Sequence, residues 1–150
     1  EMRGVRVIVI LFGSLAIDTG GMDVLVGTAG QANIGLDRSV IEHFDPVLDS
    51  QVRYLGAIWL GLGVIQLIGL GDPRRYRAVL ECTFAAVTLG GIGRVLSWLH
   101  FGMPQNDVGS IFVKAAMGIE LALIPLVWIA FRISMRKKLQ KPDRPAHRSI

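Results

Sequence analysis

The stretch that decides the fold class is DPVLDSQVRYLGAIWLGLGVIQLIGLGDPRRYR, residues 45–77. From Tyr54 to Gly71 every residue is apolar or glycine except Gln66. About 18 consecutive residues of this kind are close to the length that crosses the hydrocarbon of a bilayer as a helix. Asp45-Pro46 suits the start of such a helix, with Asp as the N-cap and Pro in the first turn, and Gly71 suits its C-terminal cap. The stretch therefore predicts a transmembrane helix.

The rest of the composition agrees with a membrane protein. The chain has 150 residues, 51% of them hydrophobic, and 18 glycines, which suits close packing between membrane helices. Apolar runs predict four spans, at about residues 5–26, 46–71, 73–99 and 108–133. We expect an all-α integral membrane four-helix bundle in residues 1–134, with a basic cytoplasmic tail in residues 135–150.

Local signals place the ends of these helices. Asp72-Pro73 repeats the start signal, so the second and third helices should be joined by a tight turn. Asp107 can cap the fourth helix, and Pro125 inside that helix predicts a kink. Residues 27–45 are polar and glycine-rich and are expected to form a loop, with one helical turn at Ser39–Phe44.

The distribution of Lys and Arg predicts the orientation. Twelve of the 16 lie at the start of the first span, at the start of the third span, or at and beyond the end of the last, and only Arg38 lies in the two opposite connections. The positive-inside rule then places both termini in the cytoplasm. A net charge of +4 with this placement indicates a membrane-flanking basic tail and no nucleic-acid partner.

Several charged residues fall within the predicted spans. Arg53, Arg94 and Lys114 would lie within roughly 10 Å of the outer boundary, at a rise of 1.5 Å per residue. Two carboxylates nearer the middle, Asp18 and Glu120, are the available counter-ions. A structural ion-pair network, an outward-opening pocket for an anionic head group or small anion, and a proton or ion path all fit these charges. The candidate pocket residues are Arg53, Arg94, Lys114, Asp18, Glu120 and Ser97, whereas Glu81 is expected to pair locally with Arg77.

Small residues on the helices predict close helix packing. The positions concerned are Gly56, Gly61, Gly63, Gly90, Gly93 and Gly118. The sequence contains no G-x-G-x-x-G or G-x-x-x-x-G-K-S/T phosphate loop, and its single cysteine, Cys82, excludes an internal disulfide. We expect no cofactor, no metal site and no catalytic residues.

Two motifs and one residue resemble a known family. RYLGAIWLGLG at Arg53–Gly63, GGIGRVLS at Gly90–Ser97, and Glu120 in the last helix are similar to the bacterial domain of unknown function 4345 family. Its members are small four-helix inner-membrane proteins, DoxX-like in outline. The resemblance covers about residues 5–133 and implies a four-helix membrane bundle with no assigned activity. The matching positions are Arg53, Gly56, Gly61, Gly63, Gly90, Gly93, Arg94, Ser97 and Glu120.

The leading functional hypothesis is a non-enzymatic accessory or interaction subunit of a membrane protein complex, in a bacterial inner membrane. Its partners would be membrane lipids and either another membrane protein or further copies of itself. The first alternative is a lipid or small-anion binding bundle with a polar pocket in the outer leaflet. The second is a small transporter or redox-linked membrane enzyme.

Overall fold

The computed structural model describes residues 2–36 and 45–139, which form a bundle of long helices. α1 (Met2–Val26) leads into the 3-10 helix η1 (Gly27–Ile34), and α3 (Pro46–Gly71) and α4 (Arg77–Phe101) follow. The last span consists of α5 (Asp107–Gly118), the π-helical turn η2 (Ile119–Leu123) and α6 (Ile124–Leu139). Four helical segments of the described chain are long and apolar enough to cross a membrane, as expected for a multi-pass membrane protein.

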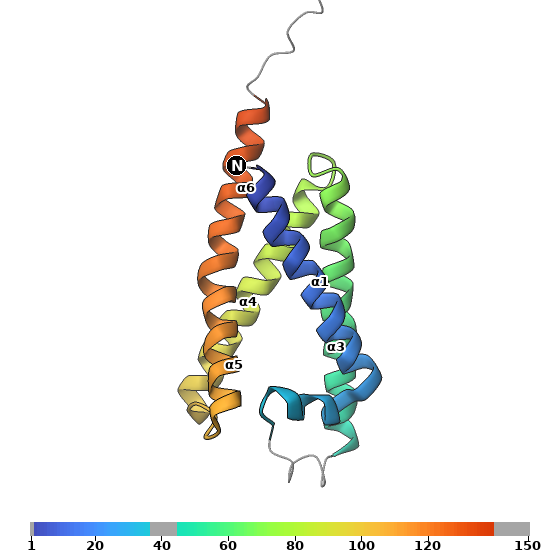
Figure 1. The fold of residues 1–150 in the computed structure, drawn as a ribbon, viewed down its shortest axis with the longest axis vertical. Helices are drawn as coiled ribbons and strands as arrows, with labels where there is room; N and C mark the ends of the chain where they lie inside the picture. Colours follow the sequence, from blue (N-terminus) through green and yellow to red (C-terminus); the bar gives the residue numbers. More distant parts are fainter. Residues whose placement is uncertain (1, 37–44, 140–150) are drawn as a thin grey trace, which may run out of the picture.

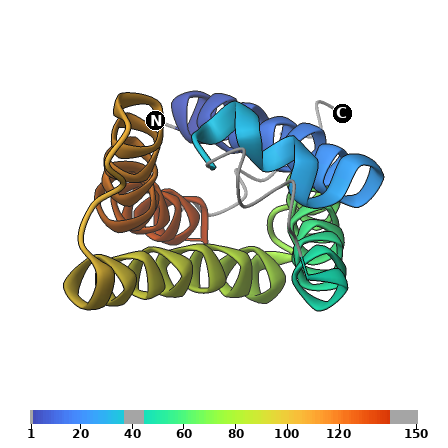
Figure 2. The ribbon, with the colours of Figure 1, turned by 90° about the horizontal axis from the view of Figure 1, so that it is seen from below.

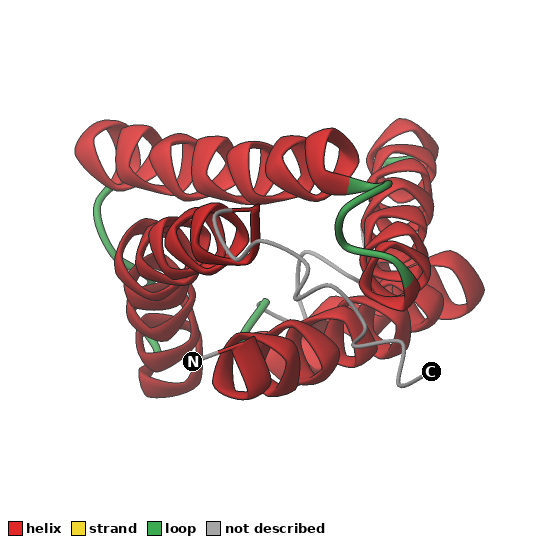
Figure 3. Cartoon of the chain, turned by 90° about the horizontal axis from the view of Figure 1, so that it is seen from above, coloured by secondary structure: helices red, strands yellow, loops and turns green. Residues whose placement is uncertain are grey.

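The four spans form a closed ring when viewed along the bundle, in the order α1, α3, α4 and then α5 with α6, which returns to α1 (Figures 2 and 3). We call one end the terminal end: it holds the start of α1, the turn Asp72–Tyr76 and the end of α6 (Figure 1). The other is the η1 end, which holds η1 and residues 102–106.

α1 and α3 approach each other through glycines. A Cβ added to Gly20 would lie 2.6 Å from the carbonyl oxygen of Gly56, and a Cβ on Gly63 would lie 2.6 Å from the carbonyl oxygen of Gly13. Carbon atoms cannot be this close to a non-bonded oxygen, so both backbones come together only because side chains are absent. An edge-to-face pair of Phe12 and Trp59, with ring centroids 5.5 Å apart, continues the same interface.

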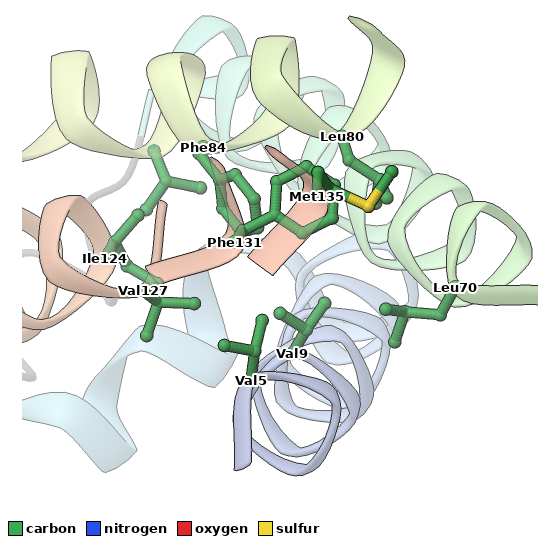
Figure 4. Packing of buried hydrophobic residues seen from close by; sticks show 10 residues of the cluster. Val5, Val9, Leu70, Leu80, Phe84, Ile124, Val127, Phe131 and Met135 are labelled. Carbon is green, nitrogen blue, oxygen red and sulfur yellow. The ribbon is translucent and has the colours of Figure 1, made fainter. Parts of the chain in front are cut away.

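The hydrophobic core lies in the half of the bundle nearer the terminal end, and Figure 4 shows how its side chains pack together. Every span contributes to it, and its buried members are Val5, Val9, Leu70, Leu80, Phe84, Val87, Ile124, Val127, Phe131 and Met135. No residue of η1 or α5 belongs to it. The half nearer the η1 end is therefore held by glycine contacts, hydrogen bonds and ion pairs.

Predicted helix starts agree with the structure to within a few residues. Asp45 is the N-cap of α3, since its carboxylate accepts a hydrogen bond from the backbone nitrogen of Val47. The third helix begins at Arg77 instead of Pro73, because the carboxylate of Asp72 caps a separate turn by accepting from the backbone nitrogens of residues 74 and 75. The cap of the fourth span is Asn106 and not the predicted Asp107.

Three other boundaries differ from the prediction. Residues 27–34, expected as part of a loop, form η1, while the turn expected at 39–44 lies outside the described residues. α3 includes Gly71, so the C-cap is Asp72. α6 continues to Leu139, beyond the predicted start of the tail at residue 135. Met135 is buried in the core because the helix face that carries Phe131 extends by one more turn.

Candidate functional site

An ion pair between Arg94 of α4 and Glu120 of η2 is the centre of the candidate site. The Nε atom of Arg94 donates to both carboxylate oxygens of Glu120, at 3.1 and 2.9 Å. The Glu120 side chain is only 10% exposed, whereas that of Arg94 is 37% exposed. The carboxylate is therefore buried much more deeply than the guanidinium group to which it is paired. The Arg94 guanidinium also lies over the ring of Phe112, 5.4 Å from its centroid.

The π-helical turn positions Glu120. The backbone nitrogen of Ile124 donates to the carbonyl oxygen of Ile119, five residues earlier, which widens the helix by one residue. Pro125 follows directly and has no N–H to offer to Leu121, so the ordinary helical bond is missing at the position where a kink was predicted. The helix widens to five residues per hydrogen-bonded turn over Ile119–Leu123, and Glu120 in this π turn faces α4.

Gly91 makes room for this carboxylate. A Cβ at Gly91 would lie 2.8 Å from the Cβ of Glu120 and 2.9 Å from the Cδ2 of Leu121. Of the three glycines in the motif Gly90–Ser97, the sequence pattern favoured Gly90 and Gly93 for packing, and at both of these an added Cβ would meet nothing within 4 Å. The contact between α4 and η2 therefore depends on the middle glycine of the three.

A pocket of about 440 Å³ opens beside Arg94 at the η1 end. Its polar lining consists of Arg94, Ser97 and Gln105, and the aromatic rings of Trp98 and Phe101 give it an apolar wall. The remaining lining residues are Gly102, Met103, Pro104 and Val113. A cation and two neutral polar groups next to an aromatic wall are suited to an anionic group with an apolar part.

Arg53 belongs to a separate network. Its Nε atom donates to Oδ2 of Asp49 at 2.7 Å, and its Nη1 atom donates to the carbonyl oxygens of Val24 and Leu25, at 2.7 and 3.1 Å. The other oxygen of Asp49 accepts from the backbone nitrogen of Thr28 at 2.8 Å. Arg53 thus supplies donors to carbonyl groups that the end of α1 leaves unpaired, and it ties the α1–η1 junction to α3.

Two of the predicted pocket residues stand apart from both networks. Asp18 and Lys114 are exposed, and neither forms an ion pair within the described part of the chain. The structure therefore brings together Arg94, Glu120 and Ser97 of the predicted set, and it leaves Arg53, Asp18 and Lys114 elsewhere. Asp49 was not predicted, although its spacing of four residues from Arg53 on one helix was a usable signal.

A third ion-pair cluster lies at the terminal end. Glu81 accepts from Nε of Arg77 at 2.9 Å, as the four-residue spacing predicted, and its second oxygen accepts from Nη2 of Arg132 at 2.8 Å. Arg132 comes from α6, 51 residues away, so no local spacing could have identified it. This cluster ties α4 to α6 and lies far from the pocket along α4.

The predicted packing glycines divide into two groups. Gly56 and Gly63 lie against α1, as described above. At Gly61, Gly90, Gly93 and Gly118 an added Cβ would have no neighbour within 4 Å, so these positions do not mediate packing among the described helices. Two glycines of α1 that were not selected, Gly13 and Gly20, complete the α1–α3 interface.

The described residues contain no group of three or more His, Cys, Asp or Glu side chains placed to hold a metal ion.

Among comparisons with known proteins, the profile of one family, described as a domain of unknown function (DUF4345), matches residues 4–131. No curated protein and no solved structure gives a match.

Proposed function

The chain belongs to the DUF4345 family, and from the pocket beside Arg94 we propose that it is a non-enzymatic membrane protein that binds an anionic group there. The ligand would be the head group of a membrane lipid or a small anion. The observation that carries the proposal is the one-sided pairing of Arg94, which donates hydrogen bonds to Glu120 through its Nε atom alone.

The remaining donors of Arg94 support this proposal. Its two Nη groups form no hydrogen bond with the described residues, and Arg94 lines the pocket together with Ser97 and Gln105. A guanidinium group held by a carboxylate on one edge presents its other edge in a fixed direction, and that edge suits the bidentate binding of a phosphate or carboxylate. Glu120 thus orients the cation and keeps it stable at a depth where a lone charge is costly.

The membrane setting is part of the proposal. With the cations gathered toward the terminal end, the positive-inside rule would place both termini in the cytoplasm of a bacterial cell, with the bundle in its inner membrane. The pocket would then open at the outer leaflet. Trp98, on the pocket wall, would lie near the membrane–water boundary, where such rings are enriched.

Replacement of Arg94 tests the proposal. We expect Arg94→Gln to weaken the binding of a short-chain phosphatidylglycerol, or of inorganic phosphate, by at least about tenfold in neutral detergent, because it removes a charge-assisted pair of hydrogen bonds. Lys114→Gln removes a nearby cation that does not line the pocket, so it should leave binding unchanged. Equal binding by Arg94→Gln and wild type, at equal helical content, would exclude the pocket as the binding site.

A second proposed function is that of an accessory subunit that packs beside another membrane protein. It is supported by a row of small exposed residues on α4, Ala86, Gly90, Gly93 and Ser97, which recur every three or four positions. Rows of this kind let a second helix approach closely in lipid. We expect Gly93→Leu to convert a larger complex to the monomer, as measured by size in mild detergent. A wild-type protein that is purely monomeric and has no co-purifying partner would contradict this role.

A further inference from the structure

A second recess lies at the terminal end, on the opposite end of the bundle from the Arg94 pocket. It has a volume of about 370 Å³ and lies between α1 and the end of α3. Its lining consists of one cation, Arg6, and the residues Ile10, Leu67, Leu70 and Gly71. We propose that this recess, the Arg6 groove, binds an anionic phospholipid, with the phosphate at Arg6 and an acyl chain along the apolar residues.

The position of Arg6 fits a lipid phosphate. Its Nη2 atom donates to the carbonyl oxygen of Leu70, in the last turn of α3, at 3.4 Å. The side chain is thereby directed across the groove, and its other donors form no hydrogen bond with the described residues. Because Arg6 is exposed near the start of a helix long and apolar enough to span a membrane, its guanidinium group would lie near the phosphates of that leaflet.

Ile10 and Leu67 extend the groove deeper than the cation. Ile10 follows Arg6 by four residues on α1, which places it on the same helix face about 6 Å further into the membrane. Its side chain is 47% exposed, so it leaves an apolar surface open next to the charge. Leu67 borders the groove from α3. A cation above an aliphatic wall matches a ligand that joins a phosphate to a hydrocarbon chain.

The charge around the groove favours an anionic lipid over a zwitterionic one. Seven described arginines lie at this end: Arg3, Arg6, Arg74, Arg75, Arg77, Arg132 and Arg136. Only Arg77 and Arg132 form ion pairs with described residues, and both pair with Glu81. Asp72 uses a carboxylate oxygen to cap the turn after α3. The excess of cations distinguishes this groove from the Arg94 pocket, where Glu120 compensates the charge.

Competition between two lipids tests the proposal. The full chain is purified in neutral detergent and incubated with equal amounts of phosphatidylglycerol and phosphatidylcholine, and the bound lipids are counted by native mass spectrometry. We expect a preference of at least about fivefold for phosphatidylglycerol, and Arg6→Gln should abolish the part of this preference that Arg94→Gln leaves intact. Arg3→Gln is the matched control: it removes an exposed cation at the same end that does not line the groove, and it should retain most of the preference.

Further variants keep the test decisive if Arg6→Gln does not fold. Ile10→Trp fills the groove without a change in charge and should lower retention of phosphatidylglycerol by a similar factor. Arg94→Gln should leave the lipid at Arg6 bound, so loss of this lipid in Arg94→Gln but not in Arg6→Gln would assign it to the other pocket and overturn the present inference. Equal retention of both lipids by wild type, or displacement of phosphatidylglycerol by millimolar inorganic phosphate, would also overturn it.

Discussion

Arg132 of α6 donates to the same Glu81 carboxylate that Arg77 contacts from one turn earlier on α4, at 2.8 and 2.9 Å. The carboxylate is 15% exposed while the two arginines are 51% and 38% exposed. One half-buried acceptor thus joins α4 to α6 through residues that are 51 positions apart in the sequence.

We expect Glu81→Gln to destabilise the bundle by about 1 kcal/mol, since two partly exposed ion pairs are lost and two arginines at the same site then repel each other. Arg132→Gln leaves the Arg77 pair in place and should cost less. The thermal unfolding midpoint in detergent measures both variants. Equal stability of Glu81→Gln and wild type would show that solvent screens the cluster completely.

Two glycines two residues apart on α3 give opposite predictions. A methyl group at Gly63 would clash with α1, so Gly63→Ala should destabilise the protein by about 1–3 kcal/mol. Gly61→Ala adds the same methyl group where no atom lies within 4 Å, and it should be neutral or slightly stabilising. Thermal unfolding of both variants under one condition provides the comparison. Similar losses would mean that helix flexibility, and not the α1 contact, requires glycine.

The glycine pair at the candidate site makes a similar prediction. Gly91→Ala would push Glu120 away from α4 and weaken its ion pair with Arg94, so both stability and anion binding at the Arg94 pocket should fall. Gly90→Ala has open space and should change neither. Stability by thermal unfolding and binding of short-chain phosphatidylglycerol are measured together. Retained binding in a stable Gly91→Ala protein would contradict the positioning role of this glycine.

Asn106 has two functions that substitution can separate. Its Oδ1 caps the last span by accepting from the backbone nitrogen of Gly109 at 2.7 Å, and its Nδ2 donates to the carbonyl oxygen of Gly35 at 2.9 Å. Asn106→Ala should cost about 1–2 kcal/mol, whereas Asn106→Asp should lose only the bond to Gly35. Asp107→Ala tests the cap that the sequence favoured and should cost less than Asn106→Ala. Unfolding midpoints rank the three variants.

Features with a local cause could be predicted from the sequence. The start of α3 follows from Asp45-Pro46, and the irregular turn follows from Pro125, since each depends on residues within one turn. The Arg77–Glu81 pair was predicted from its four-residue spacing, and the same spacing also indicates Asp49 with Arg53. These elements needed no knowledge of how the helices pack.

Features that depend on helix rotation could not be predicted. Gly61 and Gly63 have the same residue type and the same apolar surroundings, and only the packing of α3 against α1 decides which one is buried. In the same way, similar depth in the membrane was enough to propose that Arg94 pairs with Glu120. Asp18 and Lys114 do not join this pair, because that depends on which faces of α1 and α5 point toward it. The position of a residue in the sequence gives its depth along the span. The packing of the helices decides whether its side chain faces a neighbouring helix or the surface.

The placement of the hydrophobic core at the terminal end has a consequence for the motions of the bundle. Separation of the spans at the η1 end exposes little buried side-chain area, so backbone amides there should exchange with deuterium faster than those near Phe84 and Phe131. A ligand that binds beside Arg94 would then bind in the half of the bundle whose helices separate more easily. The core in the other half would keep the helices aligned.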